Sequence, residues 1–296
     1  AIVGDTIHVH PSATSYGSKN IIKRLIIVAI SHNPNNTPEA AEAKLSNINF
    51  GGTSNNSLIT GFQISNISTT TITDINDIRI INNRFIGNVT GNPSSNAQNW
   101  LVEGNIFNTG QVNVNNATGM MIKNNIFDNN SYALSNANNT TSFLNNLVIN
   151  SSANFAYQCT DPIVNNNIFL LENSITSVGL NSSTISFNNN LTYNTITLDV
   201  DDLSGSNNID SENPGFVNAP FISIDDYYNN DYNITNANAQ NGGTDGTDLG
   251  IFGANFNFDV QGRPNDFPYM TSLNISNSSV AMGQNINVTF IAEKKN

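Results

Sequence analysis

Few side chains in this sequence are of the types that move protons, and they are widely spaced. Removing a proton next to a carboxylate requires a base such as Arg or Lys and a cation that neutralises the developing charge. Between residues 51 and 210 the cationic side chains are Arg79, Arg84 and Lys123. Arg79 precedes Arg84 by only five residues, on one predicted strand and turn, and faces no carboxylate cluster of the kind that binds Ca²⁺. The pattern therefore does not favour a lyase site.

The acidic side chains do not recur at one spacing either. Hydrolysis of a glycosidic bond uses two or three carboxylates that share one face. The acids of the central region fall at different distances from the repeated phrases described below: Asp74, Asp77, Glu103, Asp128 and Glu172. No column of acids is predicted, and we expect no catalytic residue.

The histidines and the single cysteine are also poor candidates for a reactive site. His8 and His10 alternate with Ile7 and Val9, which places both imidazoles on one face of a strand. Such a pair can bind a metal ion, but no third ligand is nearby, so a surface strand is the favoured interpretation. Cys159 has no neighbouring Lys, Arg or His to stabilise a thiolate, which indicates a packed thiol.

Three acidic, turn-rich segments could supply oxygen ligands to Ca²⁺: residues 199–203, 224–233 and 244–250. The candidate metal ligands are Asp245 and Asp248, which lie close to flexible glycines. None of the segments has the spacing of an EF-hand or of a glycine-aspartate nonapeptide. Solvated turns are the favoured interpretation, with a structural Ca²⁺ site as the alternative, and no other cofactor is predicted.

A repeated phrase indicates which elements must carry these side chains. Six segments share an apolar-polar-Asn-Asn-apolar pattern, for instance KNNIF at 123–127 and NNNIF at 165–169. A repeat of about twenty residues is typical of stacked coils, each too short to bury its apolar face alone. The last asparagine of each phrase recurs every 20 to 23 residues: Asn83, Asn105, Asn125, Asn146, Asn167 and Asn190.

Asparagine supplies about a fifth of the chain, far above its usual share, and this excess needs a structural cause. Asparagine tolerates the left-handed backbone region and bonds neighbouring backbone, so it suits a sharp corner. Stacked copies can also bond one another through their amides, forming a ladder. Phe62 occupies the preceding position of this series and Asn208 the following one, so eight coils are predicted.

Alternation along each strand predicts which side chains face the interior. The outward group is Arg84, Glu103, Lys123 and Asn188. A phenylalanine column is expected to be core, with a sugar-stacking face as the alternative. The inward group is Ile81, Val102, Ile122, Phe143, Val164 and Phe187 before the corner, and Phe85, Phe107, Phe127, Val148 and Phe169 after it.

The predicted fold is an all-β, right-handed parallel β-helix in three regions. Residues 1–50 form an N-terminal cap with the first strands, and within them TPEAAEAKL (37–45) is either a short helix or a loop. Residues 51–265 form the coils and exit loops. Residues 266–296 form a C-terminal strand pair around a turn at 282–284, which either caps a coil or lies open as an adhesive edge.

The NNIF phrases resemble the pectate-lyase-like right-handed parallel β-helix family. GDTIHVHPSATSYGSKNIIKRLIIVAI resembles the entry of such domains, NPGF with TDGTDLGIFG resembles their exit coil, and TSLNISNSSVAMGQNINVTFIA resembles a segment of surface proteins from type IX secreting bacteria. The resemblance implies a secreted or cell-surface protein. Members include polysaccharide lyases, hydrolases and adhesins, so the fold alone does not select an activity.

The net charge of the chain restricts the kinds of partner that it is expected to bind. With a net charge of −12 and ten Lys plus Arg, the chain has no basic cluster for nucleic acid or an anionic membrane. It also has no apolar run long enough to insert into a membrane. We expect a non-catalytic extracellular protein that acts in adhesion, surface coating or fibre assembly, with polysaccharide or other copies of itself as partner. The alternative is a carbohydrate-active enzyme whose site is built from loops; ice binding is disfavoured because Thr69–Thr71 and Thr73 do not recur at the coil period.

Overall fold

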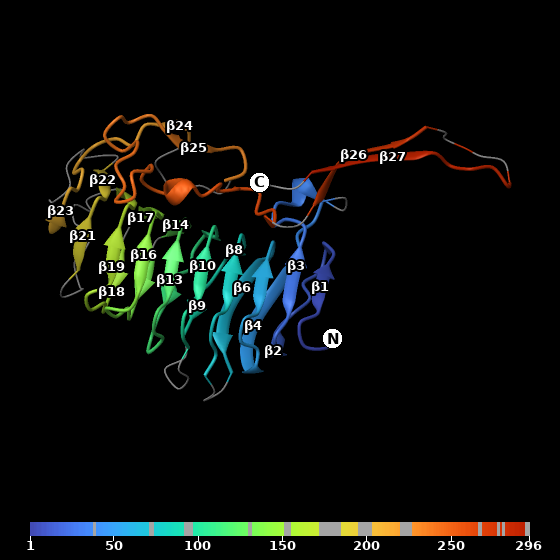
Figure 1. Ribbon diagram of the computed structural model, residues 1–296, viewed down its shortest axis with the longest axis horizontal. Helices are drawn as coiled ribbons and strands as arrows, with labels where there is room; N and C mark the ends of the chain where they lie inside the picture. The colour runs from blue at the N-terminus through green and yellow to red at the C-terminus, as the bar shows by residue number, and fades with distance from the viewer. Residues whose placement is uncertain are drawn as a thin grey trace.

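The chain folds into an elongated parallel β-solenoid of about eight turns, shown in Figure 1. The computed structural model describes residues 1–296 except 38–39, 71–73, 92–96, 130–131, 151–154, 172–184, 195–202, 220–226, 266–267, 277–278, 280–281 and 294–296. Asp199, Asp225, Glu172, Thr71 and Thr73 thus lie outside the described residues. Within the described residues no helix is long and apolar enough to span a membrane.

One long face of the solenoid is a sheet of ten described strands, all parallel to their neighbours. Each coil contributes one strand, and consecutive coils therefore lie side by side along the rod (Figure 1). In spatial order the strands are β1 (Thr6–Val9), β3 (Ile26–Ala29), β5 (Leu58–Thr60), β7 (Arg79–Ile81), β10 (Leu101–Glu103), β13 (Met121–Lys123), β16 (Ser142–Leu144), β19 (Ile163–Asn165), β21 (Ser186–Asn188) and β23 (Gly205–Ser206).

A second sheet, of thirteen described strands, forms the two other sides of the coils. One of these sides carries β2 (Lys19–Lys23), β4 (Lys44–Thr53), β6 (Gln63–Thr69), β8 (Arg84–Phe85), β11 (Ile106–Phe107), β14 (Ile126–Asn129), β17 (Leu147–Asn150), β20 (Ile168–Leu171) and β22 (Leu191–Asn194), and from β8 onward these strands follow the Asn corner. The third side of the coils carries β9 (Val89–Thr90), β12 (Val112–Asn113), β15 (Leu134–Ser135) and β18 (Ala156–Tyr157).

The remaining elements are two antiparallel hairpins and two short 3-10 helices. The hairpins pair β24 (Phe216–Asn218) with β25 (Asp231–Ile234) and β26 (Tyr269–Ile275) with β27 (Val288–Glu293), the second as the sequence predicted. The 3-10 helices are η1 (Pro34–Asn36) and η2 (Gly253–Asn255). The described part of residues 37–45 is not helical, so the loop interpretation of that segment holds.

Stacking begins inside the segment predicted as the N-terminal cap. Strand β1 pairs in parallel with β3, and β2 pairs in parallel with β4. The first strands therefore continue the same two sheets that run through the rest of the rod.

The interior is filled by columns of like residues. Phe85, Phe107 and Phe127 are fully buried, and successive rings stack with centroids 4.7 and 4.5 Å apart. The phenylalanine column is core, as predicted. One inward assignment is wrong: Ile80, and not Ile81, pairs with Val102 and joins the core. Ile81 aligns with Glu103 on the outward row, because the core-facing residue stands three positions before each ladder asparagine, and Ile80, not Ile81, has that spacing from Asn83.

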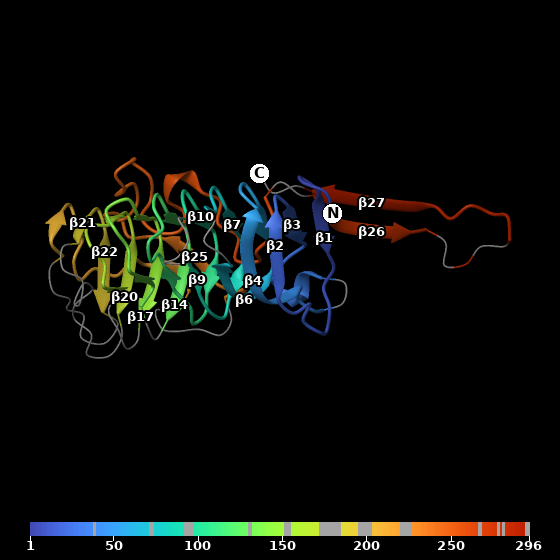
Figure 2. The same ribbon diagram turned by 90° about the horizontal axis from the view of Figure 1, so that it is seen from below.

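A second apolar cluster lies outside the coils. After the corner, alternate residues of the second sheet point outward, including Ile106, Ile126 and Ile168. These are covered by side chains such as Tyr227 and Leu249, which come from the C-terminal part of the chain. Residues 239–265, the return segment, thus run back over the coils instead of leaving at the last one (Figures 1 and 2).

Candidate functional site: two asparagine columns and a polar clamp

The inner Asn column consists of the last asparagine of each phrase, as the sequence predicted. The backbone N–H of Asn105 donates to Oδ1 of Asn125 at 2.9 Å, and the N–H of Asn125 donates to Oδ1 of Asn146 at 3.0 Å. Each Nδ2 also bonds a carbonyl of its own corner and one of the preceding coil; for Asn125 these belong to Lys123 and Val102. The bonds to the next ladder side chain and to a carbonyl of the preceding coil repeat at Asn83, Asn105, Asn146, Asn167 and Asn190.

The predicted ends of the series are confirmed. The N–H of Phe62 donates to Oδ1 of Asn83 at 3.1 Å, so Phe62 takes the first position without an amide of its own. At the other end Asn208 accepts from the N–H of Asn190 at 3.0 Å. Every buried amide of the column is satisfied by its neighbours, which leaves the column no free group for a ligand.

The residue before each ladder asparagine makes the corner. Asn82, Asn124, Asn145, Asn166 and Asn189 all have φ between 53° and 62°, in the left-handed region. Asparagine and glycine adopt this region at low cost, and the coil that departs from the pattern has Gly104 there with φ 67°. A Cβ at Gly104 would lie 3.0 Å from the ring of Phe256, so glycine is also required for packing.

These five corner residues form the outer Asn column, and the side chains of Asn82, Asn124, Asn166 and Asn189 bond the return segment. Nδ2 of Asn189 donates to the carbonyl of Gly242 at 2.8 Å, and Nδ2 of Asn124 donates to the carbonyl of Gly253 at 3.0 Å. Nδ2 of Asn82 donates to the carbonyl of Arg263 at 3.1 Å. The segment therefore travels from the last coils back toward the first. In the five phrases that have two asparagines, the first side chain faces outward and the second faces inward.

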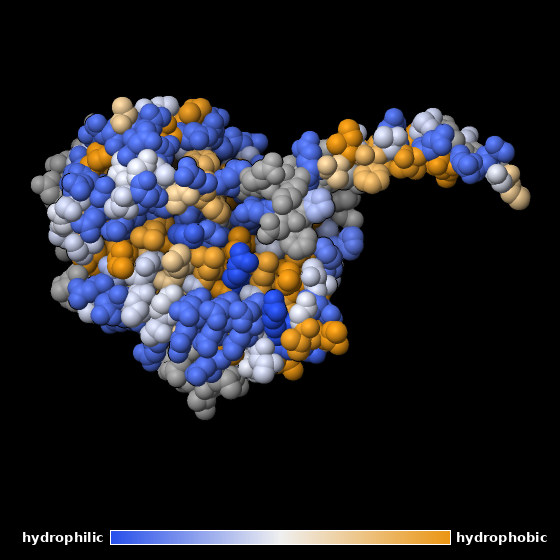
Figure 3. Space-filling view, viewed as in Figure 1, coloured by the Kyte–Doolittle hydropathy of each residue, from blue (hydrophilic) through white to orange (hydrophobic). Residues whose placement is uncertain are grey.

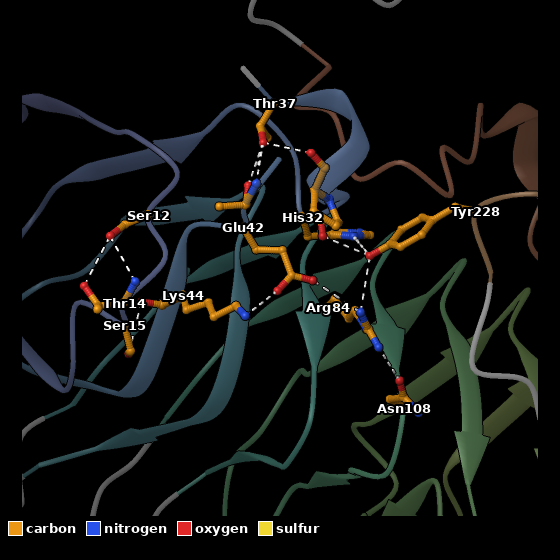
Figure 4. A network of polar contacts seen from close by, with 12 residues as sticks. Ser12, Thr14, Ser15, His32, Thr37, Glu42, Lys44, Arg84, Asn108 and Tyr228 are labelled. Atoms are coloured by element: carbon orange, nitrogen blue, oxygen red, sulfur yellow. Dashed lines mark hydrogen bonds and ion pairs between the residues drawn. The ribbon is translucent and has the colours of Figure 1, made fainter. Parts of the chain in front are cut away.

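A group of charged and ionisable side chains lies where the chain at Tyr228 meets the first coils. We call this group, His32, Glu42, Lys44, Arg84 and Tyr228, the clamp (Figure 4). Glu42 Oε2 lies 3.0 Å from Nζ of Lys44, and Glu42 Oε1 lies 3.4 Å from Nη1 of Arg84. Nη2 of Arg84 donates to Oδ1 of Asn108 at 2.8 Å. Three segments distant in the sequence, at residues 42–44, 84 and 108, are thus tied together.

Tyr228 and His32 complete the clamp. The Tyr228 hydroxyl donates to the carbonyl of His32 at 2.9 Å and lies 3.2 Å from Nδ1 of the imidazole. Burial, with a further contribution from the Arg84 charge, lowers the pKa of His32 to about 3. The imidazole is therefore neutral at pH 7, far from the pKa that suits proton transfer there. Gly262 packs against this ring, and a Cβ at that position would lie 2.0 Å from Cδ2 of His32.

A neighbouring buried pair reinforces the same junction. The Tyr227 hydroxyl donates to Oδ2 of Asp128 at 2.5 Å on the outward side of β14. Burial, and next the negative charge of Asp128, raise the pKa of Tyr227, so the phenol keeps its proton at any physiological pH. Tyr227 and Tyr228, which are adjacent in the sequence, thus attach this segment to two different coils.

The residues singled out in the sequence for metal chemistry lie apart from the clamp. Asp245 accepts from the N–H of Thr247 at 3.1 Å, and Asp248 accepts from the N–H of Asn241 at 3.0 Å, both within turns. Across the described residues no three His, Cys, Asp or Glu side chains gather as a metal site would require. A Ca²⁺ ion at Asp245 and Asp248 stays a prediction.

The other candidates are dispersed. His8 is exposed on β1, and His10 is exposed one residue beyond the end of that strand; both lie beside a cavity of about 310 Å³ that Arg263 also lines. Lys123 pairs with Glu103 at 2.8 Å on the outward row of the first sheet. Cys159 is buried, as a packed thiol should be. Arg84 is the one coil cation that the structure brings into a larger group; its partners Glu42 and Tyr228 are 42 and 144 residues away, and no spacing in the sequence indicates them.

Loss of the clamp cation should be costly. Replacing Arg84 with glutamine removes its ion pair with Glu42 and its hydrogen bond to Asn108. The nearly buried carboxylate of Glu42 then has only Lys44 as a cationic partner in the clamp. We expect the free energy of unfolding to fall by about 2 kcal/mol, less than for a fully buried pair because Arg84 is partly solvated. Urea unfolding at pH 7 measures this. The matched change at exposed Arg79 should cost no more than about 0.5 kcal/mol; equal losses at both positions would show that the clamp does not stabilise the fold.

No protein-family model matches this sequence, and no curated protein is significantly similar to it.

Proposed function

We propose that this protein is a non-catalytic extracellular or cell-surface element, a rigid rod that serves in adhesion, coating or fibre assembly. The proposal also assigns the chain to the pectate-lyase-like β-helices of type IX secreting bacteria, and hence to the secreted or cell-surface proteins that this resemblance implies. The observation that carries the proposal is the clamp. Its charged and ionisable side chains bond one another, and they tie the chain at Tyr228 to the first coils.

Rigidity is the second support. Buried amides bond coil to coil along the interior, and corner amides bond the coils to the return segment outside. A solenoid stabilised between neighbours in this way resists bending, and its outer rows are left to meet partners. In this proposal the polar side chains that are most deeply placed maintain shape, and contacts with other molecules are made by the surface.

A panel of acidic and neutral polysaccharides tests the proposal. Reducing ends and unsaturated ends are measured after incubation with the wild-type protein and with Glu42→Gln, which removes the carboxylate that pairs with both cations of the clamp. We expect no turnover by either protein, and a lower unfolding temperature for the variant. Turnover by the wild type that Glu42→Gln abolishes, with the variant still folded by circular dichroism, would identify the clamp as an active site and overturn the proposal.

A further inference from the structure

The outer face of the first sheet carries an apolar row. On each strand the residue between two outward positions points into the core, for instance Val102 between Leu101 and Glu103. The first outward position is apolar on four of the six strands from β5 to β19, and Figure 3 shows an apolar stripe across this face. In strand order the row is Leu58, Arg79, Leu101, Met121, Ser142 and Ile163.

Water reaches this row. Met121 and Ile163 are 41% and 47% exposed, and Leu58 and Leu101 are partly exposed. Arg79 is exposed as well, and none of the ion pairs among the described residues includes it. Single exposed apolar residues are normal on a protein surface, but a contiguous apolar patch marks an interaction site.

The row has the same pattern when it is followed in either direction from its centre. Between β10 and β13 lies the middle of the ten-stranded sheet, with five described strands on each side. Outward from there each half of the row is apolar, polar and apolar in turn. One half is Leu101, Arg79 and Leu58, and the other is Met121, Ser142 and Ile163. A two-fold symmetric contact requires such a self-complementary surface, because each residue meets a residue from the opposite half of the partner.

The charged positions beside the row have the same symmetry. Glu103 and Lys123 are the second outward residues of the two central strands, and they pair with each other at 2.8 Å. A two-fold axis parallel to the strands, between β10 and β13, places Glu103 of one copy opposite Lys123 of the other, and the reverse. The four side chains then alternate in sign, which is the complementarity that fixes the register of an interface.

A two-fold axis along the rod gives a poorer match. It would place the first outward row of one copy on the second row of the other, with the charges of Glu103 and Lys123 against Leu101 and Met121. Desolvating charges against apolar side chains is costly. If the axis were shifted to lie over the first row, the two Arg79 side chains would face each other and repel. The pattern therefore favours the axis parallel to the strands.

We propose that two copies of this chain associate face to face through the first sheet, about a two-fold axis parallel to the strands and between β10 and β13. Leu101 then packs on the partner's Met121, Leu58 packs on the partner's Ile163, and Arg79 donates to the hydroxyl of the partner's Ser142. Such a contact is isologous and closes at a dimer. The inference rests on the proposed role as a scaffold and specifies its partner, a second copy.

A matched pair of substitutions tests the face. Sedimentation should show the weight-average mass of the wild type rising with concentration from 31.9 kDa toward twice that value. Ile163→Asn should weaken this association at least tenfold. Ile86→Asn makes the same change at a residue of similar exposure, 46%, which follows β8 of the second sheet, and should leave association within about twofold. Equal effects of the two variants would overturn the proposal.

Exchange of the two central charges tests the register. The double variant Glu103→Lys with Lys123→Glu keeps opposite signs within each copy and across the symmetric contact, so it should dimerise with itself within about threefold of the wild type. In a mixed dimer with wild type, acid would face acid and base would face base, and we expect that dimer to be at least tenfold weaker. Native mass spectrometry of the mixture, with isotope-labelled wild type, measures the ratio. Mixed dimers at their statistical share of one half would overturn the proposed axis.

Directed cross-linking tests the orientation. Packed sheets lie about 10 Å apart, so Leu58 and the partner's Ile163 are separated by about that distance, while the two Leu58 residues are offset along the rod by five strand spacings, about 24 Å. A short bismaleimide added to mixed Leu58→Cys and Ile163→Cys proteins should link a heterodimer, with buried Cys159 unreactive. Linked homodimers of Leu58→Cys in its place would indicate an axis along the rod and overturn the proposal.

The two proposals fail separately. A folded wild type that remains a 31.9 kDa monomer at every concentration overturns the dimer, while the absence of polysaccharide turnover still supports the scaffold. A monomer that binds a neutral polysaccharide, and loses this binding in Ile163→Asn, would assign the stripe to a glycan and likewise overturn the dimer. Polysaccharide turnover overturns the scaffold whether or not dimers form.

Discussion

Replacing Asn125 with alanine is expected to lower the free energy of unfolding by about 4 kcal/mol or more. The change removes the acceptor for the N–H of Asn105 and the donor for the carbonyls of Val102 and Lys123. Asn105 and Asn125 are both fully buried, so water cannot replace these partners without opening the coil. Each buried polar group left unsatisfied costs about 1–3 kcal/mol. Urea unfolding followed by circular dichroism measures the loss.

The matched control is an asparagine that bonds between coils on the surface. Asn20 accepts from Nδ2 of Asn49 at 3.1 Å and is exposed. Asn20→Ala should change the unfolding free energy by no more than about 0.5 kcal/mol, because water solvates the freed groups. If Asn20→Ala and Asn125→Ala destabilise the protein equally, the inner column has no special role.

Acidification from pH 6.5 to pH 4.5 is expected to destabilise the protein by about 2–3 kcal/mol through His32 alone. Its pKa is about 3 in the folded protein against an ordinary value of 6.5, so between these values the unfolded chain binds the proton and the folded chain does not. Stability from this group is complete above pH 6.5 and is lost as the pH falls toward 3. Each unit of difference corresponds to about 1.4 kcal/mol.

His32→Gln isolates that contribution, since glutamine does not titrate. Urea unfolding of both proteins at a series of pH values gives the slope of stability against pH. We expect the wild-type slope to exceed that of the variant by about 1.4 kcal/mol per pH unit between pH 4.5 and 6. Parallel slopes would mean that protonated His32 is accommodated in the folded state, and therefore that the ring is not held between Tyr228 and Gly262 as described.

The inner column was predictable because its cause is local. Each coil makes the Asn corner once, and this corner requires the same residue types in every coil, so Asn105, Asn125 and Asn146 recur in the sequence at a regular interval. The double asparagine indicated a corner as well as a ladder. The error at Ile81 arose where two adjacent isoleucines precede the corner, since hydrophobicity alone does not distinguish Ile80 from Ile81.

The clamp and the path of the return segment were not predictable from spacing. Tyr228 contacts His32 across 196 residues, and Asn82 contacts Arg263 across 181. Such contacts depend on how a non-repeating segment folds back over the coils, and that segment has no period. One signal was present in retrospect: Ile106, Ile126 and Ile168 lie on the outward side of the second sheet and required a cover.

Hydrogen exchange of the ladder amides tests most directly the claim that inner asparagines hold the coils together. The backbone N–H groups of Asn105, Asn125, Asn146 and Asn167 each donate to the side chain of the next coil. We predict that these four amides exchange only through global unfolding, and that Asn125→Ala accelerates exchange at Asn105 first. Exchange as rapid as that of exposed turns in the wild-type protein would contradict the account.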